Sequence, residues 1–272
     1  MACPWKQKLE SGSLVNMENR KQKILDILET CDEITIKELS DRLDVSLVTI
    51  RKDVSKLEAK GMVVRKHGSV AKATTTHNIF QQFLPYRLRK ITKVEEKTKI
   101  AAKVMDYIEP EDTIFLDAGS SALAVANELL EKEHISIVTN SICAANLLND
   151  SNHSVYLAGG TVLSRGMCTI GSEAESFIRK FYCKKAIIST TGIRKDLSLT
   201  VTLDTEAGVK KAIIESAETV ILLATDDKFY NSSLFEFCDA SQIDIIITNH
   251  PSPPPHILRI IEEYDILLVY AD

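Results

Sequence analysis

Segment 35–68 constrains the fold most, because two helical patterns, a tight turn and a basic hairpin follow one another there in a fixed order. Thr35 and Glu38 have the spacing of a capping box, in which the two residues satisfy each other's backbone N–H groups at a helix start. Apolar residues then recur at helical spacing, at Ile36, Leu39 and Leu43. Ser46 is a candidate N-cap for a second helix. The pattern predicts two short helices joined by a tight turn. Upstream, residues 24–28 supply the apolar stripe of a further helix that ends near Cys31.

The second helix is predicted to have one apolar side, formed by Ile50, Val54 and Leu57. Its opposite side is polar and basic, with Thr49, Lys52 and Lys56, and with Arg51 and Ser55 on a flank. Residues 61–70 then predict two short strands around Gly68. From Ser46 to Lys72 there are seven Lys or Arg and two Asp or Glu, a local charge of +5 in a chain whose net charge is −5. A solvated amphipathic domain would explain the charge alone, but the order of elements favours a winged helix-turn-helix that binds DNA.

The DNA contacts are expected at the helix starts, on the second helix and near the hairpin tip. The candidate residues are Thr35, Ser46, Leu47, Thr49, Arg51, Lys52, Lys56, Arg65, Lys66 and His67.

The remainder of the chain alternates short apolar runs with helical stretches. The runs are TIFLD (113–117), ISIVTN (135–140), SVYLAGG (154–160), AIIST (186–190), TVILLAT (219–225), DIIIT (244–248) and ILLVY (266–270). Continuous apolar strands that alternate with helices predict an α/β domain with a mainly parallel sheet covered on both faces. We therefore expect a disordered leader at 1–16, a DNA-binding domain at 17–72, a linker at 73–90 and a second domain at 91–272. Met17 is an alternative translation start.

Small, hydroxyl-bearing and charged residues follow five successive predicted strands. They are Asp117, Gly119, Ser120 and Ser121; Thr139, Asn140 and Ser141; Gly159 and Gly160; Thr191; and Asp226 and Lys228. Converging backbone N–H groups and helix N-termini at strand ends are suited to anions. Asp117 would repel a phosphate, so its expected role is to accept hydrogen bonds from sugar hydroxyls or to orient its loop. Lys228 is the candidate cation for a phosphate. Each short motif is also explained by ordinary caps and turns, and a lone lysine by solvation.

Several classes of protein are disfavoured. No run of about 18 apolar residues predicts a membrane span, and the N-terminus lacks the apolar core of a signal peptide. The six cysteines are scattered without zinc-ligand spacing, as is typical of reduced cytoplasmic proteins. Asp204 and Glu206 could serve as a general base, but helix capping and stabilisation by the helix dipole explain both more simply. No catalytic residue, metal or cofactor is predicted.

The run VSLVTIRKDVSKLEAKGMVVRKHG resembles the signature of the DeoR family of bacterial transcriptional regulators, and the resemblance extends over nearly the whole chain from Met17. The family usually has a glycine pair in the wing, where this chain has Gly68-Ser69. The second half is similar to the family's sensor domain, whose fold is that of ribose-5-phosphate isomerases and related sugar-phosphate binders. The family's motifs match the strand-end residues given above other than Thr191, and they add Gly171 as an effector-site residue. Its D-x-[ST]-K-F motif has Asp227 here in place of a hydroxyl residue.

This resemblance implies a regulator, most simply a repressor, of a carbohydrate-metabolism operon that is controlled by a phosphorylated sugar. It also implies a homo-oligomer, a dimer or a tetramer, because half-sites in operators are generally read with two-fold symmetry. Two alternatives stay open. The chain could be a sugar-phosphate isomerase-like enzyme with an accessory DNA-binding module, or a regulator whose sensor domain has lost its ligand.

Overall fold

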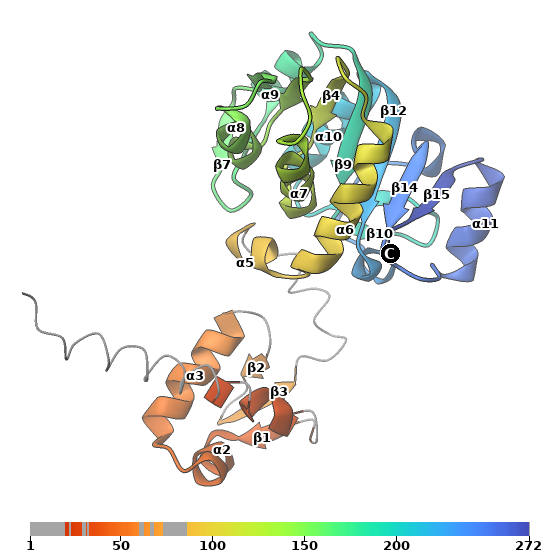
Figure 1. The fold of residues 1–272 in the computed structure, drawn as a ribbon. Helices are drawn as coiled ribbons and strands as arrows, with labels where there is room; N and C mark the ends of the chain where they lie inside the picture. Colours follow the sequence, from red (N-terminus) through yellow and green to blue (C-terminus); the bar gives the residue numbers. More distant parts are fainter. Residues whose placement is uncertain are drawn as a thin grey trace, which may run out of the picture. The chain divides into compact units, whose positions relative to one another are not determined.

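The computed structural model describes residues 20–21, 23–28, 31, 33–59, 63–65, 68–72 and 86–271. The chain divides into two compact units, Met1–Gln81 and Gln82–Asp272 (Figure 1). Each unit has an apolar core of its own. The expected leader at 1–16 and the part of the expected linker at 73–85 lie outside the described residues.

The first unit contains both the predicted helix-turn-helix and the predicted hairpin. Residues 23–28 are helical, and α2 (Ile36–Leu43), α3 (Leu47–Ala59), β2 (Val63–Arg65) and β3 (Ser69–Lys72) follow. A strand that was not predicted, β1 (Glu33–Thr35), pairs antiparallel with β3 and completes a sheet with the order β1-β3-β2. At three residues, β1 is too short to show an alternating pattern in the sequence.

Local hydrogen bonds explain where the two helices start and stop. The Glu38 backbone N–H donates to Thr35 Oγ1 at 3.1 Å, and the Thr35 N–H donates to Glu38 Oε2 at 3.0 Å. This confirms the capping box. Asp44 then adopts a left-handed conformation with φ 51° and ends α2. The Thr49 N–H donates to Ser46 Oγ at 3.2 Å, as expected for the N-cap of α3.

The second unit is built on a seven-stranded sheet with the order β15-β14-β12-β9-β4-β5-β6, and all neighbours are parallel. Its strands are β4 (Thr113–Leu116), β5 (Ser136–Thr139), β6 (Ser154–Leu157), β9 (Cys183–Ser189), β12 (Ala217–Ala224), β14 (Ile245–Thr248) and β15 (Leu267–Tyr270). They coincide with the seven apolar runs of the sequence. The mainly parallel sheet is therefore confirmed.

Helices cover both faces of this sheet (Figure 1). One apolar core joins the strands to α6 (Val94–Val104), α7 (Ser120–Leu129) and α8 (Ile142–Leu148). The other core joins them to α9 (Ser172–Ile178), α10 (Asp204–Glu215) and α11 (Pro255–Glu263). Within β4, Ile114 and Leu116 face the first core and Phe115 faces the second, as the two-residue period of a strand requires.

Several short elements lie in the loops at the strand ends. They are the hairpin β7 (Thr161–Leu163) and β8 (Cys168–Ile170), the small sheet of β10 (Gly192–Ile193), β11 (Leu199–Val201) and β13 (Phe235–Cys238), and the 3-10 helices η2 (Met105–Tyr107), η3 (Asp226–Tyr230) and η4 (Ala240–Gln242). A further helix, α5 (Tyr86–Ile91), occupies the end of the segment that was expected to be a linker. It packs into the second unit, because Tyr86 is buried in the core that includes α7.

Candidate functional sites

Helix α3 presents a basic face to solvent and an apolar face to the core. Ile50, Val54 and Leu57 are buried, while Arg51 and Lys52 are exposed. Lys56 is exposed as well, and the adjacent apolar residues Leu47 and Val48 are 41% and 70% exposed. Exposed apolar side chains beside exposed cations are the kind of surface that meets base edges and phosphates in a major groove.

Asp53 lies on the buried side of α3 and does not reduce the charge of the exposed face. It is 2% exposed, and Arg20 Nε from the first helix donates to its Oδ2 at 2.6 Å. The outer face of α3 is therefore more basic than a count along the sequence indicates.

The remaining predicted DNA contacts flank this face. Ser46 and Thr49 lie at the start of α3, where their hydroxyl oxygens are 2.8 Å apart. Thr35 lies at the start of α2, where its hydroxyl already bonds Glu38. Arg65 ends β2 in the wing, whereas Lys66 and His67 lie outside the described residues.

The wing turn accommodates serine where the family usually has a second glycine. Gly68 takes the left-handed conformation, with φ 82°. Ser69 instead belongs to β3, is buried, and donates from Oγ to Glu33 Oε1 on β1. The substitution thus adds a hydrogen bond between wing and sheet without backbone strain.

The predicted effector residues lie beyond the carboxyl ends of the strands of the large sheet. The chain runs from β4 outward to β5 and β6, and then returns to the other side of β4 for β9, β12, β14 and β15. In open α/β sheets, ligands bind beyond the strand ends at the place where the order reverses. Asp117 and Thr191 follow the two strands on either side of this place, β4 and β9, and Asn140 and Asp226 follow the next strands outward.

A buried ion pair lies at the reversal. Asp117 is 1% exposed, and its Oδ2 accepts from the Ser189 N–H at 3.0 Å, from Ser189 Oγ at 2.9 Å and from Lys210 Nζ. Lys210, on α10, is 7% exposed and also donates to the Ser189 carbonyl at 2.7 Å. The orienting role predicted for Asp117 is consistent with these bonds. Lys210 was not predicted, although its spacing from Ala207 and Ile214 puts it on the buried side of a helix.

Lys93, at the N-cap of α6, and the charged residues of η3 form a second polar cluster. Asp227 contacts Lys93 Nζ at 3.0 Å and Lys228 Nζ at 3.4 Å, and Lys93 also bonds Asp226. Burial opposes the ionisation of Asp227, but the two lysines hold the pKa of this carboxyl well below its usual value. The unexpected Asp227 therefore pairs with Lys228, the predicted phosphate cation.

Lys97 adds a positive charge to this cluster without a matching carboxylate. It is buried on α6, and its Nζ donates to the carbonyls of Arg89 and Thr92, each at 2.6 Å. Burial, together with the charge of nearby Lys228, lowers the pKa of Lys97 to about 8. No ion pair within the described residues neutralises Lys97. Lys97 and Arg89, which also lies close enough to affect its pKa, were both missed by the sequence analysis.

Unsatisfied polar atoms also occur in this region. Among the described residues, the buried side-chain atoms without a hydrogen bond are Tyr86 Oη, Arg89 Nε, Asn140 Oδ1 and Asn231 Oδ1. Buried polar groups in native proteins are nearly always satisfied, so these atoms have hydrogen-bonding capacity left to offer a ligand. The Asn140 amide is anchored by its Nδ2, which donates to the Thr169 carbonyl at 3.0 Å.

The loop residues after the strands differ in how many of their hydrogen-bonding groups are free to contact a ligand. Helix α7 begins at Gly119 with no side-chain cap, and Ser120 and Ser121 form its first turn. Thr139 Oγ1 instead donates to the Leu116 carbonyl, and Ser141 caps α8. Two of the predicted glycines have backbone roles. At Gly160 a Cβ would lie 2.8 Å from the Ile170 carbonyl oxygen, and Gly171 takes a φ of 95° just before α9. Gly159, in contrast, is exposed.

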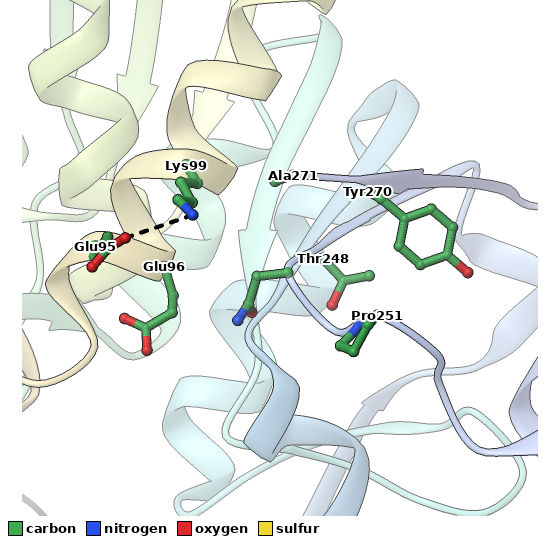
Figure 2. Close-up of a pocket in the computed structure, with 8 residues that line it drawn as sticks. Glu95, Glu96, Lys99, Thr248, Pro251, Tyr270 and Ala271 are labelled. Carbon is green, nitrogen blue, oxygen red and sulfur yellow. Dashed lines mark ion pairs between the residues drawn. The ribbon is translucent and has the colours of Figure 1, made fainter.

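A separate cavity of about 290 Å³ lies between α6 and the ends of β14 and β15 (Figure 2). Its lining consists of Glu95, Glu96, Lys99, Thr248, Asn249, Pro251, Tyr270 and Ala271. Lys99 Nζ is 3.6 Å from Glu95 Oε1, so the one lysine in this lining is paired. With Glu96 also present, the cavity is unsuited to a phosphate.

No group of three His, Cys, Asp or Glu side chains within the described ranges could hold a metal ion. In the same part of the chain, no helix combines the length and apolar character needed to cross a membrane.

Comparison with known proteins gives matches for both units. A model of the DeoR-like helix-turn-helix domain matches residues 20–76, and one of the DeoR C-terminal sensor domain matches residues 92–250. The glycerol-3-phosphate regulon repressor of Escherichia coli (strain K12) is 32% identical over 250 residues, which are 92% of this chain and 97% of that repressor. The transcriptional repressor GlcR of Bacillus subtilis (strain 168) is 30% identical over 233 residues, 85% of this chain and 88% of that one.

Among solved structures, a D-ribose-5-phosphate isomerase in complex with phospho-erythronic acid is similar over 50% of this chain and 53% of its own, with 20% identity and a TM-score of 0.37. The curated relatives are regulators and not enzymes, and they match this chain over most of its length. The chain therefore belongs to the DeoR family of transcriptional regulators.

Proposed function

We propose that this regulator is a repressor of a carbohydrate-metabolism operon and that a phosphorylated sugar controls it. Residues 17–72 bind operator DNA through α3 and the wing, and residues 91–272 bind the effector at the strand ends. The main support is the buried Lys97, which has no ion-pair partner among the described residues, together with the unsatisfied polar atoms near the carboxyl ends of the parallel strands.

The two ends of the proposed effector are assigned by charge. The phosphate belongs with Lys97 and Lys228 and with the uncapped N-terminus of α7, because cations and free backbone N–H groups stabilise an anion. The sugar hydroxyls belong with Asn140 Oδ1, which lacks a donor, and with the Asp117 carboxylate.

Thermal-shift measurements on the full chain test the effector assignment. The panel is glycerol 3-phosphate, fructose 1-phosphate, glucose 6-phosphate and ribose 5-phosphate, each beside its unphosphorylated counterpart. Glycerol 3-phosphate comes first because the Escherichia coli relative is named for it. We expect stabilisation by a phosphorylated compound only, lost in Lys97→Met and kept in Lys99→Met, whose lysine is exposed. Equal stabilisation by an unphosphorylated counterpart would contradict the assignment.

A second candidate is a regulator whose sensor unit no longer binds a ligand. The pairing of Asp227 with Lys228 favours it, since that carboxylate neutralises the predicted phosphate cation. Operator binding that is intact, together with no stabilisation by any compound of the panel, would select this candidate.

Operator binding is tested by footprinting and by the dependence of affinity on salt. Lys52→Gln should weaken binding and reduce the slope of log affinity against log salt concentration by about one, because one phosphate contact is lost. Lys37→Gln, exposed on α2 and outside the predicted contacts, is the matched control. We also propose that the regulator is a homo-oligomer. A monomer by light scattering that retained full operator affinity would exclude this.

A further inference from the structure

Helix α5 is the first described element after the segment that joins the two units, and it contributes to the proposed effector site. Tyr86 begins α5, where its N–H donates to the Arg165 carbonyl at 2.8 Å and its side chain is buried. Figure 1 shows α5 beside α7, the helix with the uncapped N-terminus, and the two helices are in contact.

Two of the four unsatisfied buried atoms belong to α5, namely Tyr86 Oη and Arg89 Nε. The Tyr86 hydroxyl lies beside the Cys143 thiol, three residues beyond Asn140. A thiol is only a weak hydrogen-bond partner, and the hydroxyl has no hydrogen bond of ordinary geometry. Burial and this thiol raise the pKa of Tyr86, so the hydroxyl keeps its proton and can donate.

Arg89 lies within electrostatic reach of both polar clusters of the site. Its carbonyl accepts from Lys97 Nζ on one side. Its charge also acts on Cys168, a thiol that lies within electrostatic reach of Asp117 and Lys210 as well. The guanidinium is thus near both clusters while its Nε lacks an acceptor.

We propose that α5 is the element through which the effector acts on the DNA-binding unit: Arg89 and Tyr86 donate hydrogen bonds to the bound phosphosugar and thereby fix α5. This inference rests on the proposed effector site and assigns its regulation. A bound phosphosugar offers these two donors strong acceptors, and the added hydrogen bonds hold α5 in place. The ligand thus binds one arrangement of α5 better than another, and this difference in affinity is the requirement for an allosteric effect.

The test separates effector affinity from transmission in the full-length protein. The probe is glycerol 3-phosphate, or the compound of the panel above that gives the largest thermal shift. For each variant, titration gives the effector Kd, and the ratio of operator Kd values with and without saturating effector gives the coupling. The variants are Arg89→Gln and Tyr86→Phe, which removes only the hydroxyl from a buried ring. The matched control is Lys90→Gln, because Lys90 is exposed on the same helix.

For the unaltered protein and Lys90→Gln we expect the ratio typical of allosteric coupling, on the order of 5–150. In Arg89→Gln the effector Kd should rise roughly tenfold or more, because a charged donor is lost, and the ratio at saturation should fall toward one. Tyr86→Phe should reduce the ratio of operator Kd values with a smaller change in the effector Kd. If Arg89→Gln cannot be saturated with effector, Tyr86→Phe still allows this ratio to be measured.

Two results would overturn the inference while leaving the effector site in place. The first is a raised effector Kd with an unchanged ratio at saturation, which would make Arg89 a binding residue only. The second is an unchanged Kd and ratio in both variants. A failure of the proposed function differs from both, because the unaltered protein itself would then show no response to any compound of the panel.

Discussion

The Asp117–Lys210 ion pair joins two residues that are far apart in the sequence and almost fully buried. Removing one member of such a pair leaves the other as an uncompensated buried charge, which typically destabilises a protein by about 3–5 kcal/mol. We therefore expect Lys210→Met to lower the free energy of unfolding of the second unit by about that amount in urea denaturation. Lys211→Met changes the charge equally at an exposed position of the same helix and should be nearly neutral. Equal stability of the two variants would show that the pair contributes little.

Lys97 should make effector affinity dependent on pH. Arg89 and Lys228 add positive charge around it, and Asp227 and Glu96 add negative charge, but burial dominates and its pKa is about 8. Lys97 is therefore charged below pH 8 and increasingly neutral above it. Affinity for a phosphosugar should fall as the pH rises from 7 to 9, with a limiting slope of about tenfold per pH unit for one linked proton.

The pH effect is measured as the effector Kd by calorimetric titration at several pH values between 7 and 9. Lys97→Met should bind weakly at every pH and show little slope. Lys99→Met should keep the slope of the unaltered protein, because Lys99 is exposed and pairs with Glu95. A flat profile for the unaltered protein would remove Lys97 from the binding site.

The residues of the site could be predicted only in part. Asp117 and Asn140 follow buried strands, so their place at the sheet edge could be derived from the strand pattern alone. Lys97, Arg89 and Lys210 lie on helices, where a cation is usually solvated, and their contacts join segments distant in the sequence. For Lys210 a clue existed in its spacing from buried apolar residues. For Arg89 there was none, because α5 is short and lies where a linker was expected.

At the scale of helices and strands, the capping box at the start of α2 is a local device that the sequence predicted fully. Thr35 Oγ1 accepts from the Glu38 N–H and donates to Glu38 Oε2 at 2.8 Å. Thr35→Ala removes the cap and should lower the free energy of unfolding of the first unit by about 1 kcal/mol. Lys37→Ala, on an exposed position of the same helix, is the control. An unchanged thermal midpoint in Thr35→Ala would mean that water satisfies the freed N–H equally well.

The strands divide into those that the sequence identifies and those that it does not. The seven strands of the large sheet lie under helices on both faces, so they are continuous apolar runs. β7, β8, β10, β11 and β13 are two to four residues long and pair with one another in the loops beyond the strand ends of the large sheet. Their pairing depends on where the large sheet places those loops. The periodicity of the local sequence therefore does not predict these strands.

At the scale of the whole molecule, the proposed control makes effector and operator compete through one equilibrium. If saturating effector weakens operator binding by a given factor, thermodynamic linkage requires that operator DNA weaken effector binding by the same factor. We expect the two factors to agree within error for the unaltered protein. The measurement is effector titration with and without saturating operator duplex, compared with operator titration with and without saturating effector.

In the Lys90→Gln protein, effector and operator should still weaken each other's binding by the same factor as in the unaltered protein. In Arg89→Gln both factors should fall toward one. A scrambled duplex of equal length and charge serves as the control for operator DNA, because nonspecific binding depends on phosphate contacts alone. Unequal factors would mean that a third equilibrium intervenes, such as a change of oligomeric state that only one ligand drives. Repeating the titrations over a range of protein concentrations would identify that case, since an assembly step makes the factors depend on concentration. Equal factors independent of concentration would instead assign the control to a conformational change within one assembly.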